Sequence, residues 1–552
     1  MVSSFDIFDT CLVRKCGTPS DFFDVLSYKV FNGNVSEDVR RGFVVERKRA
    51  ESVACADDRA TLEDIYRVFG FSHPLLASKE DLLKRELECE NAMLVPVLAV
   101  RNLINDLRQK GHKIVFVSDM YLSSVFLKSV LLEFGFFQEK DAIYVSCEEG
   151  KTKFSGELFK HIKEKEGIEY KDWEHYGDNV RSDLLTARQV GIKTHQIGHV
   201  YTPYPQKWKD NDYNLGYQVE SILAGVSRAL HYSEVDNSHK DFVLDLIAPF
   251  YCSLVCKVLQ DASKKEIKRL FFFARDAYQM YRIAQRELVM FPDLSVEYVY
   301  VSREALYNGD ERVKINYFKE IGLASESDNV AIVDTTTSGL TLKYLNEILR
   351  NNGFKELFGY YFILWDDERK IDVDINHGHF ELSQPYLTNK TYRAFLDRIW
   401  IFENFFGLND QKKTVGYKLN GEKTAPVFSD VLGEEDCFLE NNSYWSLVHE
   451  SLLGKYVDCF IQTELWRFSD EIFYHVAMPT LASFFAMPDK YYLEALVGYR
   501  RYNADNDYVK KESFFKLLRT RGRDSGWKKA TVIYNTPRWL YKLHQMLKSL
   551  WN

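Results

Sequence analysis

Short apolar runs alternate with segments of helical periodicity through the first 200 residues. A strand and loop are predicted at 1–13, and buried strands at 112–119, 142–146 and 192–197. Strands that alternate with helices predict a doubly wound parallel sheet of the α/β class. Residues 18–108 interrupt the alternation, because apolar residues recur there every three or four positions with few strand signals. We therefore expect a helical insertion in this domain.

The alternation returns in the second half of the chain. Residues 242–261 predict a buried helix, and apolar runs at 268–277, 296–303, 329–334 and 359–365 predict strands that are separated by helices. A second doubly wound parallel sheet is therefore expected, followed by a helical C-terminal region.

The pattern predicts four parts. The segment Tyr-Thr-Pro-Tyr-Pro ends the first alternation at residue 205, and few periodic signals follow until about 240. The expected parts are an α/β domain at 1–205, a linker at 206–240, a second α/β domain at 241–430 and a helical region at 431–552.

Composition narrows the class of protein. With 46% apolar and 15% aromatic residues, the chain can bury sizeable cores and is not a disordered protein. A net charge of −8 argues against a general nucleic-acid binder. The nine cysteines include no CxxC pair, and the N-terminus carries no signal-peptide pattern, so a cytoplasmic protein with reduced thiols is expected. Asp245, Pro249 and Lys257 favour a buried helix over a membrane span at 242–259.

Polar side chains fall at or near the predicted strand ends of the first domain. Asp6, Ser118, Lys153 and Asp178 are in such positions, and the carboxyl ends of parallel strands meet at one edge of a sheet. A partly desolvated carboxylate such as Asp6 can act as a nucleophile or hold a divalent cation. The alternative is a strand followed by an ordinary Asp-Thr turn.

This order of motifs resembles the haloacid dehalogenase superfamily over residues 1–200. The resemblance implies a Mg²⁺-dependent phosphatase whose helical cap, at about 18–108, closes over the site. It implies a nucleophile at Asp6, a phosphoryl ligand at Ser118, a neutralising lysine at Lys153 or else Lys151, and a magnesium site made of Asp6, the Phe8 backbone carbonyl, Asp178 and Asp183.

One position departs from the family pattern. Its phosphatases usually carry a general acid two residues after the nucleophile, where this chain has Phe8. General acid catalysis is typically worth roughly 10²–10⁴-fold in rate. Asp9, one residue further on, is the candidate replacement, and a slow or inactive site is the alternative.

The sharpest stretch of the second half is 329–341. A strand runs into Asp334 and a loop rich in Thr and Ser with Gly339, and a helix follows. Backbone N–H groups and hydroxyls in this arrangement form a phosphate cradle, whereas a Thr-rich N-cap on a surface helix is the alternative.

This half resembles the type I phosphoribosyltransferases over roughly 245–370. Two departures are that Thr335 replaces the family's second acid and that the loop is one residue short. The resemblance implies that Asp334 stabilises the ribose of phosphoribosyl pyrophosphate (PRPP). It implies a 5-phosphate loop at Thr335, Thr336, Thr337, Ser338, Gly339 and Thr341, and pyrophosphate contacts at Arg275, Asp276 and Arg303.

The fusion of the two domains resembles the bacterial polysaccharide ribofuranosyltransferases. That resemblance implies transfer of 5-phosphoribose from PRPP to a lipid-linked or growing polysaccharide, as in O-antigen or capsule synthesis, and then removal of the 5-phosphate. Two alternatives stay open. The first is a sugar phosphatase with a non-catalytic binding domain. The second is an inactive scaffold of a synthesis complex, which the departures from the family patterns at Phe8 and Thr335 favour.

The C-terminal tail combines tryptophan with basic residues. On one helical face it carries Trp539, Leu543, Met546, Leu547 and Leu550, with Arg538, Lys542 and His544 around them. This pattern is typical of a helix at an anionic membrane surface, so a peripheral contact with the inner face of the cell membrane is predicted. A helix docked on the protein itself is the alternative.

Overall fold

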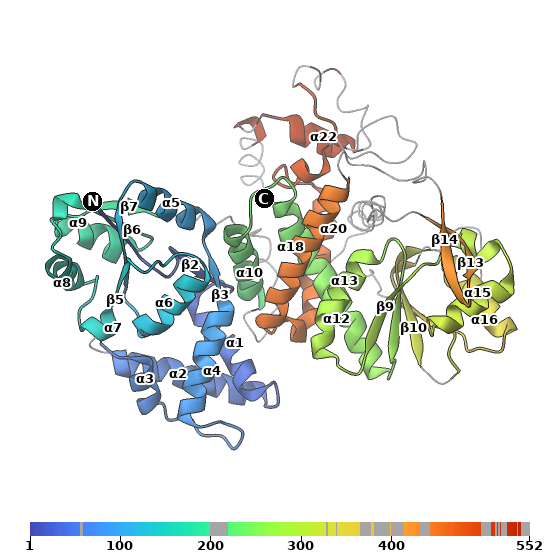
Figure 1. The fold of residues 1–552 in the computed structure, drawn as a ribbon, viewed down its shortest axis with the longest axis horizontal. Coiled ribbons are helices and arrows are strands. Elements are labelled where there is room, and N and C mark those ends of the chain that lie inside the picture. The colour runs from blue at the N-terminus through green and yellow to red at the C-terminus, as the bar shows by residue number, and fades with distance from the viewer. Residues whose placement is uncertain are drawn as a thin grey trace, which may run out of the picture. The chain divides into compact units, whose positions relative to one another are not determined.

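The chain forms two compact units, each described here by itself (Figure 1). The first comprises Met1–Asp236 with Cys459–Arg467, and the second comprises Asn237–Asp458 with Phe468–Asn552. The computed structural model describes residues 1–55, 59–198, 219–326, 329–337, 339–364, 377–379, 398, 413–429, 442–497, 509–513, 516, 519, 527–537 and 539–541.

The first unit contains the predicted parallel sheet. Its five strands pair in the order β5-β4-β1-β6-β7, all of them parallel. Residues 114–118 are all buried, as expected for a strand covered on both faces. The strands are β1 (Val2–Phe5), β4 (Lys113–Ser118), β5 (Ala142–Val145), β6 (Trp173–Gly177) and β7 (Lys193–Gln196).

A helical insertion separates β1 from β4. The chain leaves the sheet through β2 (Leu12–Arg14) and returns through β3 (Leu94–Pro96), and these two strands pair in antiparallel fashion. Between them lie α1 (Phe22–Phe31), α2 (Glu37–Ala54), α3 (Leu62–Val68) and α4 (Lys79–Met93), after the short turn η1 (Pro19–Asp21). These four helices gather on one side of the unit, away from α8 and α9 (Figure 1).

The remaining helices of this unit connect or flank the sheet strands. Val115, Phe159 and Trp173 belong to the apolar core between the sheet and its helices. The elements are α5 (Leu98–Gln109), α6 (Ser124–Glu133), α7 (Ser146–Glu149), α8 (Glu157–Glu166), η3 (Tyr170–Asp172), η4 (Val180–Thr186), α9 (Ala187–Gln189) and α10 (Val219–Ser233). Helix α10 lies within the predicted linker, of which 206–218 is outside the described residues.

The second unit also contains the predicted parallel sheet, which confirms the expected fold class. The strands pair in the order β12-β11-β10-β8-β9, all parallel. They are β8 (Arg269–Phe273), β9 (Ser295–Val299), β10 (Val330–Thr337), β11 (Phe358–Leu364) and β12 (His377–His379). An antiparallel hairpin of β13 (Thr414–Asn420) and β14 (Lys423–Phe428) follows.

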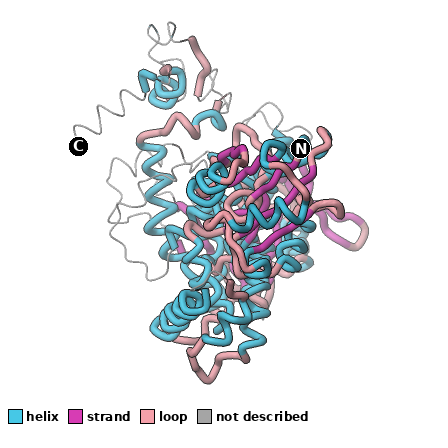
Figure 2. The backbone as a smooth tube through the Cα atoms, turned by 90° about the vertical axis from the view of Figure 1, so that its left-hand side faces the viewer, coloured by secondary structure: helices cyan, strands magenta, loops and turns pink. Residues whose placement is uncertain are grey.

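Helices make up most of the regular structure of the chain (Figure 2). From residue 237 onward the described helices and helical turns are α11 (Lys240–Phe242), η6 (Val243–Ile247), α12 (Ala248–Lys264), α13 (Tyr278–Glu287), η7 (Leu288–Met290), α14 (Arg303–Tyr307), α15 (Glu311–Glu320), α16 (Leu340–Asn351), α18 (Asn442–Gln462), η9 (Leu465–Phe468), α19 (Ser469–Glu471), η10 (Ile472–Ala477), α20 (Met478–Ala486), η11 (Leu493–Leu496) and α22 (Lys528–Asn535).

Among the described residues, Lys240–Lys264 is the one helix whose length and composition would allow it to cross a membrane. In its most apolar stretch, 94% of the residues are buried inside the protein. Asp245 is among them, and Tyr492 donates a hydrogen bond to its carboxylate at 3.2 Å. The prediction of a buried helix at 242–259 is confirmed. Most of the predicted tail helix, including 542–552, lies outside the described residues.

Candidate functional site

Asp6 follows β1 directly and lies at the carboxyl end of the first sheet. Its backbone N–H donates to the carbonyl of Tyr176 at 2.9 Å, which continues the pairing of β1 with β6. The residue is 7% exposed. The chain then turns sharply, because Asp9 has a φ of 54° and its N–H donates to the carbonyl of Leu12 at 2.7 Å. The Asp6 carboxylate is thereby fixed at the edge where parallel sheets bind ligands.

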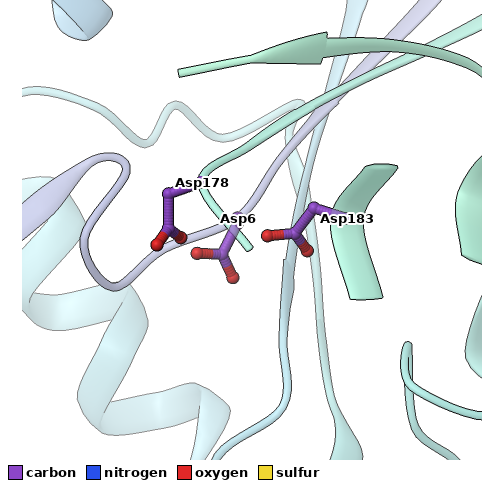
Figure 3. A group of neighbouring side chains, drawn as sticks. All are labelled: Asp6, Asp178 and Asp183. Atoms are coloured by element: carbon purple, nitrogen blue, oxygen red, sulfur yellow. The ribbon is translucent and has the colours of Figure 1, made fainter. Parts of the chain in front are cut away.

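Three carboxylates meet at this edge. Asp178 comes from the loop after β6, and Asp183 comes from the helical turn η4. One oxygen of each, together with one of Asp6, lies within 4.8 Å of the others, and the three side chains point toward one another (Figure 3). Carboxylate oxygens are the ligands that Mg²⁺ prefers, so this set fits a divalent cation as the sequence predicted.

Lys153 is the cation of the cluster. Its ammonium group donates to Oδ1 of Asp6 and to Oδ1 of Asp183, the latter at 2.7 Å. Lys151, the alternative lysine, contacts Nδ1 of His161 at 3.0 Å instead. Three carboxylates beside one ammonium leave an excess of negative charge, which a bound divalent cation would offset.

The Lys153 loop is held by Asp119, the residue after Ser118. Oδ1 of Asp119 accepts from the backbone N–H of Lys153 at 2.8 Å, and Oδ2 accepts from that of Phe154 at 3.1 Å. Charged acceptors make stronger hydrogen bonds than neutral ones. The end of β4 therefore positions both Ser118 and the lysine that contacts Asp6.

The pKa values of Asp6, Lys153 and Asp183 are shifted in different directions. Burial raises the pKa of Asp6, although Lys153 opposes the shift. Burial also disfavours charge on Lys153, but Asp6 and Asp183 raise its pKa, so the ammonium stays charged. Burial likewise opposes ionisation of Asp183, yet Lys153 and the hydrogen bond with His175 lower its pKa. Of Asp6 and Asp183, Asp6 is thus the carboxyl group whose ionisation burial opposes more effectively.

A buried relay orients Asp183. Trp173 Nε1 donates to Ser4 Oγ at 2.7 Å, Ser4 Oγ lies 2.7 Å from His175 Nδ1, and His175 Nε2 lies 3.3 Å from Asp183 Oδ1. Burial lowers the pKa of His175, so its ring is neutral. With the proton on Nε2, each group in the chain donates to the next, and the last donor is directed at Asp183.

The cluster opens into a pocket of about 720 Å³. Asp6, Ser118, Lys153, Asp178 and Asp183 line it, and so do Phe8 and Asp9. The structure therefore brings together every site residue that the sequence predicted for the first domain. The insertion supplies the opposite wall with Phe22, Phe23, Lys48, Glu51, Ser52 and Cys55.

Several residues of this site were not predicted. Asp119 carries a detectable signal, since an acid directly after a strand end is at the correct edge of the sheet. His175 lies inside a strand, and Arg14 lines the pocket from β2 with its guanidinium 4.4 Å from the centre of the Phe8 ring. Neither has a sequence signal, because its role depends on contacts with residues distant in the chain.

Asp334 marks the corresponding edge of the second sheet. It lies near the carboxyl end of β10, and its Oδ1 accepts from the N–H of Thr335 at 2.9 Å. Burial, and then the nearby Asp276, raise its pKa to about 7, whereas Arg303 opposes the shift. Asp276, which follows β8, and Arg303, at the start of α14, are therefore within electrostatic reach of Asp334.

The turn after β10 leads directly into the helix α16. Gly339 has a φ of 77° and precedes α16 without a side-chain cap, and Thr341 lies in the first turn. The Thr335 hydroxyl is buried and has no hydrogen-bond partner among the described residues. Thr336 and Thr337 belong to β10, but their side chains, like the whole of Ser338, lie outside the described part. Arg275 follows β8 beside Asp276.

Known structures are similar to part of this chain. A haloacid dehalogenase (HAD) phosphatase from Thermococcus onnurineus matches with a TM-score of 0.28 and 20% identity over 39% of this chain and 89% of that chain. The magnesium-bound HAD-hydrolase YfnB from Bacillus subtilis matches with a TM-score of 0.25 and 18% identity over 35% of this chain and 84% of that chain. The L-2-haloacid dehalogenase from Xanthobacter autotrophicus matches with a TM-score of 0.30 and 13% identity over 43% of this chain and 92% of that chain.

No protein-family model matches the sequence, and no curated protein does. The chemistry of the site therefore rests on its own residues.

Proposed function

We propose that the chain is a two-activity enzyme of polysaccharide assembly. The second unit transfers 5-phosphoribose from PRPP to a lipid-linked or growing polysaccharide, and the first unit removes the 5-phosphate to leave ribofuranose. The observation that carries the phosphatase half is the convergence of Asp6, Lys153, Asp178 and Asp183 in one pocket. The transferase half is supported by the buried setting of Asp334 and by the resemblance of the sequence around it.

In the first unit, a phosphate monoester binds with its phosphoryl group against Ser118 and Lys153. The Asp6 carboxylate attacks phosphorus, the bond to the ester oxygen breaks, and phosphorylated Asp6 forms. Water then attacks phosphorus, inorganic phosphate leaves and the carboxylate is restored. Lys153 offsets the charge on the phosphoryl oxygens. A magnesium ion on Asp6, the Phe8 carbonyl, Asp178 and Asp183 would supply further charge stabilisation.

The leaving oxygen must gain a proton in this scheme. Phe8 lacks a proton to give, whereas Asp9 lines the same pocket and is partly exposed. We assign the role of general acid to Asp9, reached through the turn in which its φ is positive.

In the second unit, PRPP loses pyrophosphate while an acceptor hydroxyl attacks the anomeric carbon. Positive charge develops on the ribose ring, and the Asp334 carboxylate would stabilise it. The backbone at Gly339 and the Thr335 hydroxyl would bind the 5-phosphate at the N-terminus of α16. Arg275 and Arg303 would contact the pyrophosphate.

The phosphatase half is tested with the full chain and ribose 5-phosphate. Asp6→Asn is expected to lower phosphate release at least about 10³-fold, because the nucleophile is lost. Asp172→Asn is the matched control, since Asp172 lies outside the pocket on the same unit. Unchanged release by Asp6→Asn would remove the proposed nucleophile.

The transferase half is tested by calorimetric titration of the full chain with PRPP and Mg²⁺, with ribose 5-phosphate as the comparison. We expect saturable binding that favours PRPP and is lost in Asp334→Ala. Binding of sugar phosphates without preference for PRPP would favour a phosphatase with a second, non-catalytic binding domain. No phosphate release and no PRPP binding by the folded chain would favour a scaffold.

The polysaccharide acceptor and the membrane contact of the tail belong to the same proposal. The supporting pattern is the basic and tryptophan-rich segment after residue 537, in which Trp539 is 69% exposed. A lipid-linked acceptor would place the enzyme at the cytoplasmic face of the cell membrane.

A further inference from the structure

A second pocket, shallow and open to solvent, lies at the edge of the sheet in the second unit. Its volume is about 400 Å³, within the range of small-molecule sites, and its lining comes from the start of α13 and from the end of β9 with the residue after it. Every side chain that lines it is aromatic or charged, and none is aliphatic. The lining residues are Tyr278, Tyr281, Arg282, Glu297, Tyr298 and Tyr300, called here the tyrosine pocket.

Tyr298 is the centre of this lining. Tyr278, Tyr281 and Tyr300 surround it, each with its ring centre 5.5 Å from that of Tyr298 and with interplanar angles of 75°, 31° and 78°. Rings packed in this way hold one another in place. The aromatic lining of the pocket is therefore organised before a ligand enters.

The charges in the tyrosine pocket are already paired. Arg282 contacts the carboxylate of Glu450 at 2.7 Å, and Glu297 pairs with Arg269. The two arginines and two glutamates of these pairs balance one another, so the pocket has no net positive charge to attract an anionic ligand such as a phosphate. A neutral ligand with many hydroxyl groups needs only hydrogen-bond donors and acceptors, which guanidinium, carboxylate and phenol groups supply together.

The pocket adjoins the turn that carries Arg275 and Asp276. The Tyr298 hydroxyl lies 3.5 Å from the carbonyl oxygen of Arg275. Asp276 and Arg275 both act on the pKa of Tyr298, and Asp276 also acts on that of Asp334. Tyr298 of the pocket and Asp334 are thus both within electrostatic reach of Asp276.

We propose that the tyrosine pocket binds a saccharide. Sugar rings place C–H groups against aromatic side chains and hydroxyl groups against paired charges, and the pocket offers both. If the transferase function proposed above holds, its position beside the Arg275–Asp276 turn makes this saccharide the acceptor. The saccharide site itself does not depend on that function.

The test is saturation-transfer NMR on the full chain, with the methyl glycosides of glucose, galactose, rhamnose and N-acetylglucosamine as probes. At least one glycoside is expected to bind, and Arg282→Ala and Tyr281→Ala are each expected to weaken that binding about tenfold or more. Adenosine is included because a nucleoside also stacks on aromatic rings.

The controls match the chemistry of the variants. Arg350→Ala removes another arginine that pairs with a glutamate at 2.7 Å, and Tyr307→Ala removes a tyrosine that is 61% exposed. Both lie outside the tyrosine pocket and should bind the glycosides as the unmodified chain does. Circular dichroism of all four variants identifies any that fail to fold. If one of the two pocket variants does not fold, the other one, with its matched control, tests the proposal.

The outcomes separate the pocket from the proposed transferase. Glycoside binding that is lost in the pocket variants, with no PRPP binding by calorimetry, supports the saccharide site and removes only its role as the acceptor site. Failure of every glycoside to bind at about 10 mM would overturn the proposal. Adenosine binding that is lost in Tyr281→Ala, without glycoside binding, would overturn it too.

Discussion

Phe8 occupies the position, two residues after Asp6, at which the sequence resemblance places a general acid. The Arg14 guanidinium lies over the Phe8 ring, 4.4 Å from its centre. The Phe8 side chain therefore has a packing role and cannot donate a proton. Asp9 shares the pocket and carries a titratable oxygen. Of these two side chains, only that of Asp9 can act as the general acid.

Asp9→Asn is predicted to slow the release of phosphate from ribose 5-phosphate by roughly 10²-fold, because an alkoxide leaves poorly without a proton. p-Nitrophenyl phosphate, whose leaving group is stable as an anion, should be hydrolysed at nearly the original rate. The two values of kcat/KM are compared for Asp9→Asn and for Ser20→Ala, a pocket residue without an acid. Equal losses on both esters would argue against Asp9 as the acid.

Asp334→Asn is predicted to stabilise the protein at pH 8. Burial and Asp276 raise the pKa of Asp334 from 3.8 to about 7, so the folded state binds more protons than the unfolded state between these values. Stability is therefore lost as pH rises through that window, and the cost is complete above pH 7. Asparagine removes the charge and keeps an acceptor for the Thr335 N–H.

The expected gain from Asp334→Asn is about 2–4 kcal/mol in the free energy of unfolding at pH 8 and little at pH 4. Chemical denaturation at the two pH values measures it, with the exposed Asp293→Asn as the control. A gain of the same size at both pH values would contradict the assigned pKa.

Among the elements, the loop that carries Lys153 is held partly by the residue that follows β4. Both oxygens of Asp119 accept backbone N–H groups of this loop. The loop follows a different strand, β5, and the helix α7. Asp119 thus acts as a positioning residue between neighbouring elements.

Asp119→Ala is predicted to lower kcat about 10-fold to 100-fold, because Lys153 would lose its fixed distance to the phosphoryl group. Affinity for orthovanadate should fall in parallel, whereas a merely structural role would lower thermal stability and leave the affinity of the folded fraction unchanged. Asp119→Asn, which keeps one acceptor, should restore part of kcat and part of the affinity for orthovanadate. Asp81→Ala, at an exposed helix N-terminus, is the control.

The elements were the part of the fold most accessible from sequence. Buried runs such as 114–117 are apolar without interruption, which identifies a strand covered on both faces. Asp6 and Ser118 could be assigned to the site because Asp6 directly follows a short buried strand and Ser118 ends another. The His175 relay and the Asp119 contacts could not, since they join residues 8 to 171 positions apart in the sequence. The tyrosine pocket had no local pattern because its residues come from a helix and a strand.

For the whole molecule, the account assigns one reaction to each unit. Sites that share no residues usually respond independently to substitution. Asp6→Asn should therefore leave PRPP binding unchanged, and Asp334→Ala should leave phosphate release from ribose 5-phosphate unchanged. Both measurements use the full chain. Loss of both activities in either single variant, with the fold intact by circular dichroism, would contradict the division of roles.

The central claim is that Asp6 forms a covalent bond to phosphorus, and the most direct measurement is chemical trapping. The full chain is mixed with Mg²⁺ and p-nitrophenyl phosphate, quenched in acid within one turnover and reduced with borohydride, which converts an acyl phosphate to an alcohol. Peptide mass spectrometry should then find homoserine at position 6 and unmodified Asp9, Asp178 and Asp183. Steady release of phosphate with no modified Asp6, or with the modification at Asp9, would contradict the account.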